Sequence, residues 1–268
     1  MERLRILITN DDGIQASGLV SLVRELSSLA DVFVAAPDRE RSATGHAITM
    51  HQPLRASLVE LPPAVTAYSI SGTPADCVKL AVDKLYAGQI DFVVSGINHG
   101  ANLGSDVLYS GTVSAALEAV MLGLPAVAFS LAAPFEAASR PCFQWAAETA
   151  AHLMKLILVN PWPEDTLLNV NIPGGTRELL GVRVTSLGQM RYKNPIEQRE
   201  DPWGNTYFWL GGQFDESVNP EVTDVWAVQN GYVSVTPLQF DLTNYRLMDE
   251  IAAWELKLPS REEKHDHE

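Results

Sequence analysis

The sequence predicts an α/β fold built on a mostly parallel β-sheet with helices on both faces. Through the first half of the chain, apolar runs typical of buried strands alternate with segments in which apolar residues recur at helical spacing. The chain has 268 residues, of which 46% are hydrophobic. It can therefore bury the core of one large domain, or of one domain with a smaller appendage.

The elements of the first half follow from these patterns in order. Apolar runs bounded by turn residues predict strands over residues 4–9, 31–36, 47–60, 66–71, 91–97 and 125–131. Helical spacing predicts helices over residues 17–30, 74–86, 111–123 and 136–159. Thr73 followed by Pro74 is typical of a helix start, and Gly123 of a helix end. Strands joined by helices in this way imply parallel pairing.

The second half of the chain has a different character. Strands are expected over residues 167–172, 182–187 and 232–237, and helices over residues 221–229 and 244–255. Residues 188–220 mix Trp, Tyr, Gly and Pro with charges, which indicates irregular hairpins that project from the body. We expect residues 1–180 to form the core, residues 181–257 to complete the same domain, and residues 258–268 to be a disordered tail.

Composition argues against several classes of function. The 19 basic and 33 acidic residues give a formal net charge of −14, whereas proteins that bind polymeric nucleic acid need clustered Lys and Arg. The two cysteines lie in no Cys-x-x-Cys pattern, and no signal peptide or apolar segment of roughly 18 residues is present. These observations predict a cytoplasmic protein whose partners include neither polymeric nucleic acid nor a membrane.

The most informative segment is the turn Asn10-Asp11-Asp12-Gly13, directly after the first predicted strand. In an open α/β sheet, ligands bind at the carboxyl ends of the strands. Two carboxylates at that edge repel each other, and a divalent cation with oxygen ligands would relieve the repulsion. The same residues are also good turn formers, so this segment alone leaves a metal site and a plain turn equally open.

Two loops after other predicted strands carry polar residues suited to the same site. The first offers Ser42 as an oxygen ligand and Gly45 as a point of close approach to a substrate. The second offers Asn98, whose side-chain carbonyl oxygen suits a hard cation. A solvated loop and a flexible turn are the structural alternatives. The roles of His46 and His99, which lie in these loops, stay open.

The segment Ser110-Gly111-Thr112 opens a predicted helix. Backbone N–H groups at a helix N-terminus suit a phosphate, although an ordinary N-cap is the structural alternative. No Walker A sequence is present, and no Gly-x-Gly-x-x-Gly follows the first strand, which disfavours ATPases and dinucleotide dehydrogenases. Thr73 and Asp76 are spaced as a capping box, for which we favour a structural role.

Together these loops supply two carboxylates, a serine, an asparagine and a helix start at one predicted sheet edge. That set is typical of metal-dependent hydrolysis of a phosphate ester. Five motifs along the chain resemble the SurE (survival protein E) family of 5′-nucleotidases, and the resemblance covers most of residues 4–245. The motifs lie in residues 8–13, 35–42, 71–78, 95–102 and 110–116, and two later matches lie in residues 223–238 and 241–243.

The resemblance implies a Rossmann-like core and one divalent metal ion, Mg²⁺ or Mn²⁺. Its ligands would be Asp11, Asp12, Ser42 and Asn98. The phosphate pocket would comprise Asn10, Gly45, Ser110, Gly111 and Thr112. The family hydrolyses nucleoside 5′-monophosphates, and some members also cleave 3′-nucleotides or short polyphosphate. Family members are homodimers or homotetramers, so the hairpins and C-terminal helix of residues 181–257 would serve oligomerisation.

The mechanism expected from these residues is attack of a metal-activated water on phosphorus, with Asp11 and Asp12 as the catalytic residues. An aspartyl-phosphate phosphatase stays open as an alternative, with one of the two acids as nucleophile. Adjacent acids fit it poorly, because such enzymes space their acids two apart. A non-hydrolytic, metal-dependent nucleotide binder is the other alternative. Candidates for contacting the base are Arg191, Tyr192 and Trp203.

Overall fold

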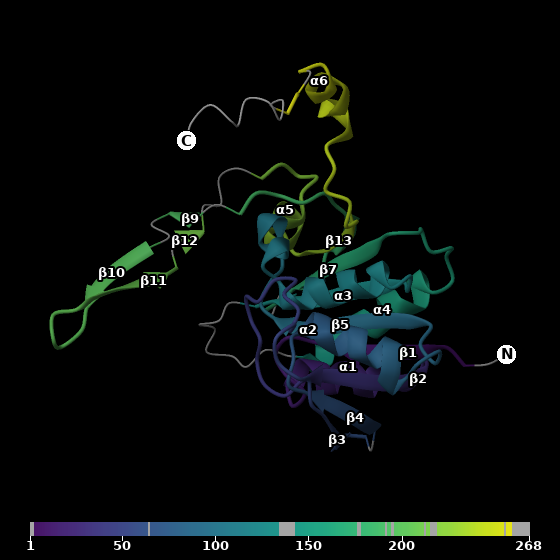
Figure 1. Cartoon of the computed structure of the whole chain (residues 1–268). Coiled ribbons are helices and arrows are strands. Elements are labelled where there is room, and N and C mark those ends of the chain that lie inside the picture. The colour runs from purple at the N-terminus through teal and green to yellow at the C-terminus, as the bar shows by residue number, and fades with distance from the viewer. Residues whose placement is uncertain are drawn as a thin grey trace.

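The computed structural model describes residues 3–63, 65–133, 143–175, 178–190, 192–193, 196–211, 213–214, 219–254 and 256–258. In this part of the chain, nine strands form one sheet in the order β3-β4-β2-β1-β5-β6-β7-β13-β8 (Figure 1). Their bounds are β1 Arg5–Thr9, β2 Asp31–Pro37, β3 Ala56–Leu61, β4 Val65–Ile70, β5 Phe92–His99, β6 Ala126–Ala132, β7 Leu167–Pro173, β8 Gly181–Val184 and β13 Tyr232–Leu238.

Parallel pairing runs without a break from β4 through β2, β1, β5 and β6 to β7. The pairs β3–β4 and β13–β7 are antiparallel, and β8 pairs with β13 in parallel. The predicted α/β class with a mostly parallel sheet is therefore confirmed. The carboxyl ends of β1, β2 and β5 meet at one edge of this sheet, which is where ligands bind in such folds.

Helices cover both faces of the sheet. On one face, α1 (Ser17–Leu26) packs against α4 (Phe143–Ile157). On the other face, α2 (Pro74–Leu80) packs against α3 (Gly111–Met121). The strands between them are buried on both sides: Ile6 and Ile8 face the first core, and Leu7 between them faces the second. This explains why β1 is a continuous apolar run rather than an alternating one.

Several predicted boundaries shift in the structure. The expected strand over residues 47–60 is wrong over its first part, because only β3 from Ala56 pairs with β4. Residues 46–49 are instead bonded to α2 and α3 through side-chain contacts. The expected helix 17–30 ends at Leu26, where the Ser27 hydroxyl donates to the Val23 carbonyl. The first residues of the expected helix 136–159 lie outside the described residues.

The remaining elements are short. A π-helical turn, η1 (Ala81–Leu85), continues α2, and a 3₁₀ turn, η2 (Gly104–Leu108), precedes α3. Helix α5 (Asp224–Gln229) packs against β7 and β13. The expected helix 244–255 is the 3₁₀ turn η4 (Tyr245–Leu247) followed by α6 (Met248–Ala252). None of the helices in the described residues combines the length and the hydropathy that crossing a membrane requires.

Two hairpin pairs extend from the body, as predicted for residues 188–220 (Figure 1). They pair β10 (Ile196–Glu200) with β11 (Thr206–Leu210), and β9 (Tyr192–Lys193) with β12 (Gln213–Phe214). Strands β8 and β13 belong to the main sheet, so part of the region 181–257 is continuous with the core. The domain boundary at residue 180 stays a prediction, and most of the expected tail 258–268 lies outside the described residues.

Candidate functional site

Two neighbouring carboxylates lie at the carboxyl end of β1. Asp11 is buried, with 4% of its surface exposed, and its Oδ1 accepts a hydrogen bond of 2.5 Å from the hydroxyl of Thr112. Asp12 is half-buried, and its Oδ2 accepts from the backbone N–H of His99 at 3.1 Å. The first acid is thereby tied to the start of α3 and the second to the end of β5.

The pKa values of both aspartates are raised, which indicates that a nearby cation would stabilise the pair. Burial raises the pKa of Asp11, against the effect of the Thr112 hydrogen bond. Burial and the neighbouring Asp11 charge raise the pKa of Asp12 to about 7. The Glu40 carboxylate adds repulsion to both acids. A positive charge between the two carboxylates would favour their ionised forms and reverse these shifts.

The other predicted ligands are neutral oxygens, and this matches the chemistry around the pair. In the described residues, no three His, Cys, Asp or Glu side chains are grouped so that they could hold a metal. A cation at this edge would combine the two aspartates with neutral oxygens, for which Asn98 and Ser42 are the predicted sources. Oxygen-only ligation of this kind suits a hard cation such as Mg²⁺ or Mn²⁺.

Asn98 lies near the end of β5 and is 9% exposed. Its amide nitrogen donates to the Gly100 carbonyl at 2.8 Å, so the side-chain oxygen is the atom left to serve a cation. Gly96, two residues earlier, has a φ of +125°, and a Cβ added there would lie 2.2 Å from the Phe129 carbonyl oxygen. Only glycine allows β5 to approach β6 this closely ahead of Asn98.

Ser42 lies in the loop after β2 and is exposed. Its hydroxyl donates to the Glu40 carboxylate at 2.7 Å rather than to either aspartate. The loop itself lies against the aspartate turn, because the Arg41 N–H donates to the Asp11 carbonyl at 2.7 Å. A Cβ on Gly13 would also approach the Arg39 backbone to 3.0 Å. The structure thus brings the loop to the site without bonding Ser42 to the acids.

The start of α3 lies against Asp11. Ser110 is the N-cap, and its hydroxyl accepts from the Val113 N–H at 3.0 Å. A Cβ on Gly111 would lie 2.7 Å from the Asp11 Cβ, which shows how closely the helix start approaches the aspartate turn. The first turn of a helix presents backbone N–H groups and the positive end of its dipole, which favours an anion.

Gly45 and Asn10 lie near this helix start, and their N–H groups donate hydrogen bonds to neighbouring backbone carbonyls. The Gly45 N–H donates to the Tyr109 carbonyl at 3.1 Å, so Gly45 holds its loop beside the helix start. The Asn10 amide donates to the Gly13 carbonyl at 3.0 Å and closes the turn. The Asn10 Oδ1 is buried without a hydrogen-bond partner among the described residues, and an uncompensated buried acceptor of this kind is common at functional sites.

The two histidines have different surroundings. His46 Nε2 lies 2.8 Å from a Glu118 carboxylate oxygen on α3, and the His99 ring packs edge-on against Phe143. The predicted capping box of Thr73 and Asp76 is confirmed. Of the three candidates for contacting the base, Arg191 lies outside the described residues and Trp203 is 84% exposed.

Sequence reasoning missed a buried polar network beneath the site. The Asn171 side chain on β7 bonds both the N–H and the carbonyl of Asn102, at 2.8 and 3.0 Å. Asp224 accepts from the N–H groups of Gly104 and Gly188, at 2.8 and 2.7 Å. These contacts fix the loop that follows β5, a few residues after Asn98. The two asparagines Asn169 and Asn171 inside a strand that is otherwise apolar were the signal that could have revealed them.

Comparisons with known proteins show similarity over most of the chain. The family model described as "Survival protein SurE" matches residues 6–194. A 5′-nucleotidase SurE from Syntrophomonas wolfei is 50% identical over 92% of this chain and 93% of its own length. The corresponding protein from Heliobacterium modesticaldum is 49% identical over 94% of this chain and 92% of its own. The crystal structure of the SurE protein from Aquifex aeolicus has a TM-score of 0.81 and 41% identity, covering 94% of this chain and 99% of that one.

Proposed function

Since the chain belongs to the SurE family, we propose that it is a metal-dependent 5′-nucleotidase that hydrolyses nucleoside 5′-monophosphates to nucleoside and phosphate. The observation that supports this most directly is the pair of adjacent carboxylates, Asp11 and Asp12, beside the start of α3. The pair suits a cation, and the helix start suits a phosphate. Both features lie at the sheet edge where α/β enzymes bind substrates.

We propose one divalent cation, Mg²⁺ or Mn²⁺, held by Asp11, Asp12, Ser42 and Asn98. The two adjacent carboxylates, of which Asp11 is buried and Asp12 half-buried, and the side-chain oxygen of Asn98 support this set. Ser42 would have to exchange its bond to Glu40 for one to the cation. When bound, the cation withdraws charge from the phosphoryl group and acidifies a water molecule.

The protein residues then supply positioning and electrostatic stabilisation. The hydroxyl of Thr112 holds Asp11 in place through its 2.5 Å bond. The first turn of α3, with Ser110 and Gly111, receives the phosphoryl oxygens and stabilises the charge that develops on them. The proton of the attacking water passes to one of the two aspartates, which are the proposed catalytic residues.

A phosphate-release assay tests the proposal. The panel contains 5′-, 3′- and deoxynucleotides and tripolyphosphate, each with Mg²⁺, with Mn²⁺ and with EDTA. We expect release from 5′-monophosphates that EDTA abolishes, and we propose that 3′-nucleotides and short polyphosphate are weaker substrates. Tight nucleotide binding without release would support a non-hydrolytic binder instead. A phosphorylated aspartyl peptide would support the aspartyl-phosphate mechanism.

We further propose a homodimer or homotetramer in the cytoplasm, with no polymeric nucleic acid and no membrane as partner. The net charge of −14 supports the exclusion of nucleic acid. The two cysteines in 268 residues fit a reducing compartment. Exposed aromatic residues on the projecting hairpin support self-association.

A further inference from the structure

The loop between β2 and β3 carries two proposed site residues, Ser42 and Gly45, although it has no helix or strand of its own. Both Ala43 and Gly45 have positive φ values, 56° and 54°. Without regular structure, such a segment keeps its conformation only if neighbouring elements fix it. Its contacts therefore decide where Ser42 and Gly45 lie.

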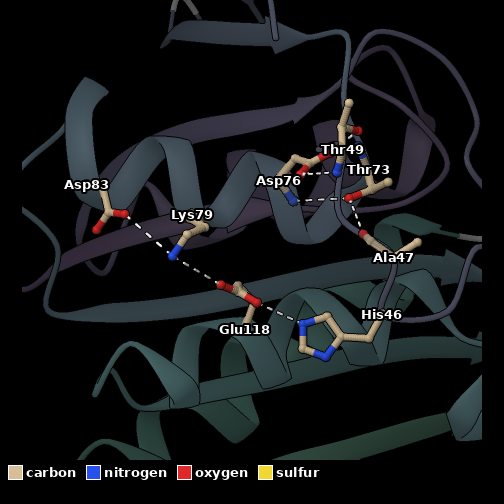
Figure 2. Close-up of polar contacts among 8 residues, drawn as sticks. All are labelled: His46, Ala47, Thr49, Thr73, Asp76, Lys79, Asp83 and Glu118. Carbon is tan, nitrogen blue, oxygen red and sulfur yellow. Dashed lines mark hydrogen bonds and ion pairs between the residues drawn. The ribbon is translucent and has the colours of Figure 1, made fainter. Parts of the chain in front are cut away.

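The Arg41 and Gly45 N–H groups bond to the Asp11 and Tyr109 carbonyls, and His46 adds a side-chain contact directly after Gly45. Figure 2 shows its ring pointing at Glu118 on α3, and Nε2 lies 2.8 Å from the carboxylate. The Glu118 side chain is only 8% exposed, whereas that of His46 is 27% exposed. A carboxylate buried to this degree requires a hydrogen-bonding partner. Lys79, which also faces this carboxylate, is half exposed and its Nζ lies 3.8 Å from it.

The next residues of the loop are fixed to the start of α2 (Figure 2). Asp76 accepts from both the N–H and the hydroxyl of Thr49, at 3.0 and 2.6 Å. The Thr73 hydroxyl donates to the Ala47 carbonyl at 2.7 Å. These bonds hold residues 47–49 whether or not His46 is present. His46 is thus the side chain that ties the loop to α3, the helix whose first turn borders the site.

We propose that His46 is a positioning residue for this site. Its bond to Glu118 fixes the segment from Ser42 to His46 against α3, so that Gly45 stays beside Tyr109 and Ser42 stays beside the aspartate turn. This role rests on the proposed function, since it concerns the same cation and phosphate. Glu118 is the matching anchor on the helix and touches no substrate.

A matched pair of substitutions tests the role. In His46→Gln the amide nitrogen is as many bonds from Cα as Nε2 and can still donate to Glu118. In His46→Asn the amide nitrogen is one bond short and cannot reach. Lys79→Met is the control, because it removes the distant cation and leaves the His46–Glu118 bond intact.

The readouts are binding of Mn²⁺ by calorimetry without substrate, inhibition by inorganic phosphate, and KM and kcat for nucleoside monophosphates. We expect His46→Asn to weaken phosphate and Mn²⁺ binding and raise KM by about tenfold, with kcat changed by less than about threefold. His46→Gln and Lys79→Met should stay close to wild type. A Glu118→Ala and His46→Asn double variant should be no worse than either single variant.

Three outcomes would overturn the proposal: equal binding by the Asn and Gln variants, additive losses in the double variant, or an effect on kcat alone. Circular dichroism and thermal unfolding establish that each variant is folded. Failure of the proposed function is separately visible, because wild type would then release no phosphate from nucleotides. The Mn²⁺ and inorganic phosphate measurements do not depend on turnover.

Discussion

Gly111 lies where the first turn of α3 comes closest to the aspartate turn. A methyl group there would lie 2.7 Å from the Asp11 Cβ and 2.9 Å from its Oδ2. Alanine favours helix over glycine by about 1 kcal/mol, so local propensity and the geometry of the site act in opposite directions at this residue. The chain keeps the poorer helix former where a side chain would displace Asp11.

Gly111→Ala should therefore reduce function without unfolding the protein. We expect kcat/KM for a nucleoside 5′-monophosphate to fall by about 100-fold, because displacing a catalytic group by roughly 1 Å costs that much. Gly211→Ala is the matched control, since nothing lies within 4 Å of a Cβ at that exposed position. Wild-type turnover in Gly111→Ala would show that Asp11 does not need its present position.

Asp11→Asn tests the charge of the same residue at nearly constant shape. The amide oxygen can still accept from Thr112, so the bond to α3 is retained. Burial raises the pKa of Asp11 in the metal-free protein, so removing its charge should leave that form at least as stable as wild type.

We expect Asp11→Asn to lose the rise in Tm that Mn²⁺ gives wild type, and to lose about 100-fold or more in turnover. Glu60→Gln, at an exposed position on β3, is the charge-matched control. Thermal unfolding in EDTA and in Mn²⁺ measures the first effect. An intact Mn²⁺ shift in Asp11→Asn would remove this residue from the ligand set.

At the scale of elements, the sequence predicted what depends on pattern and missed what depends on distant contacts. The apolar runs of β1, β2, β5, β6 and β7 are buried on both faces, so their positions were readable directly. Residues 47–55 looked like part of a strand, yet Ala47 and Thr49 bond to Thr73 and Asp76 at the start of α2. No local sequence pattern distinguishes such a bonded loop from a strand.

In the site, too, the sequence pattern predicted which segments come together but not which side chains bond to each other. Asp11, Asp12, Asn98 and the start of α3 were expected at one edge because parallel strands bring their carboxyl ends together. Their convergence is visible in the bonds from Thr112 and His99 to the two acids. The partner that Ser42 takes, Glu40, was not foreseen. Side-chain partners such as this depend on loop conformation, which the sequence pattern does not specify.

The network under the loop after β5 gives a prediction about stability. Asn171 is fully buried and satisfies both backbone groups of Asn102. Asn171→Ala leaves the Asn102 N–H without its bond in the interior, although the Asn102 carbonyl still accepts from the Asn169 amide at 2.8 Å. We expect a loss of about 2 kcal/mol in the free energy of unfolding. Urea unfolding measures it. Asn244→Ala, at an exposed position where the side chain makes no capping bond, should change stability by less than about 0.5 kcal/mol.

The start of the β1–β5 pair gives a prediction about pH. The Asp91 carboxylate accepts from the Arg5 backbone N–H and from its guanidinium, at 2.6 to 3.0 Å. These bonds lower the pKa of Asp91 below its ordinary value of 3.8. The ionised form therefore stabilises the fold above that value, and the contribution disappears as pH falls through the lower folded pKa.

Asp91→Asn should accordingly cost roughly 0.5–1 kcal/mol near pH 7, as expected for a partly exposed ion pair with several hydrogen bonds. The difference from wild type should shrink once the pH falls below about 3.8. Denaturant titrations at several pH values measure the difference. If the difference in free energy of unfolding between the variant and wild type stays constant down to pH 2.5, the charge of Asp91 does not contribute to stability.

At the scale of the whole molecule, the projecting hairpin leaves apolar surface uncovered. Along β11, Phe208 is 61% exposed, Trp209 59% and Leu210 85%. Successive residues of a strand point to opposite faces, so both faces of this two-stranded ribbon carry exposed apolar side chains. An isolated two-stranded hairpin is marginally stable in water, and a large exposed apolar patch indicates an interaction surface.

A second copy of the chain is the partner that we propose for this surface, so the particle mass should be a multiple of 29.3 kDa. Phe208→Glu with Trp209→Glu places one charge on each face of the ribbon, and light scattering should then show a monomer or a smaller assembly. Leu58→Glu is the control, because Leu58 is 64% exposed but belongs to β3, the edge strand of the main sheet, which is separate from the hairpin. A monomeric wild type would contradict the oligomer. An unchanged mass in the double variant would place the interface elsewhere. Helix α6 also extends from the body, with Met248 54% exposed, and would be the next surface to substitute.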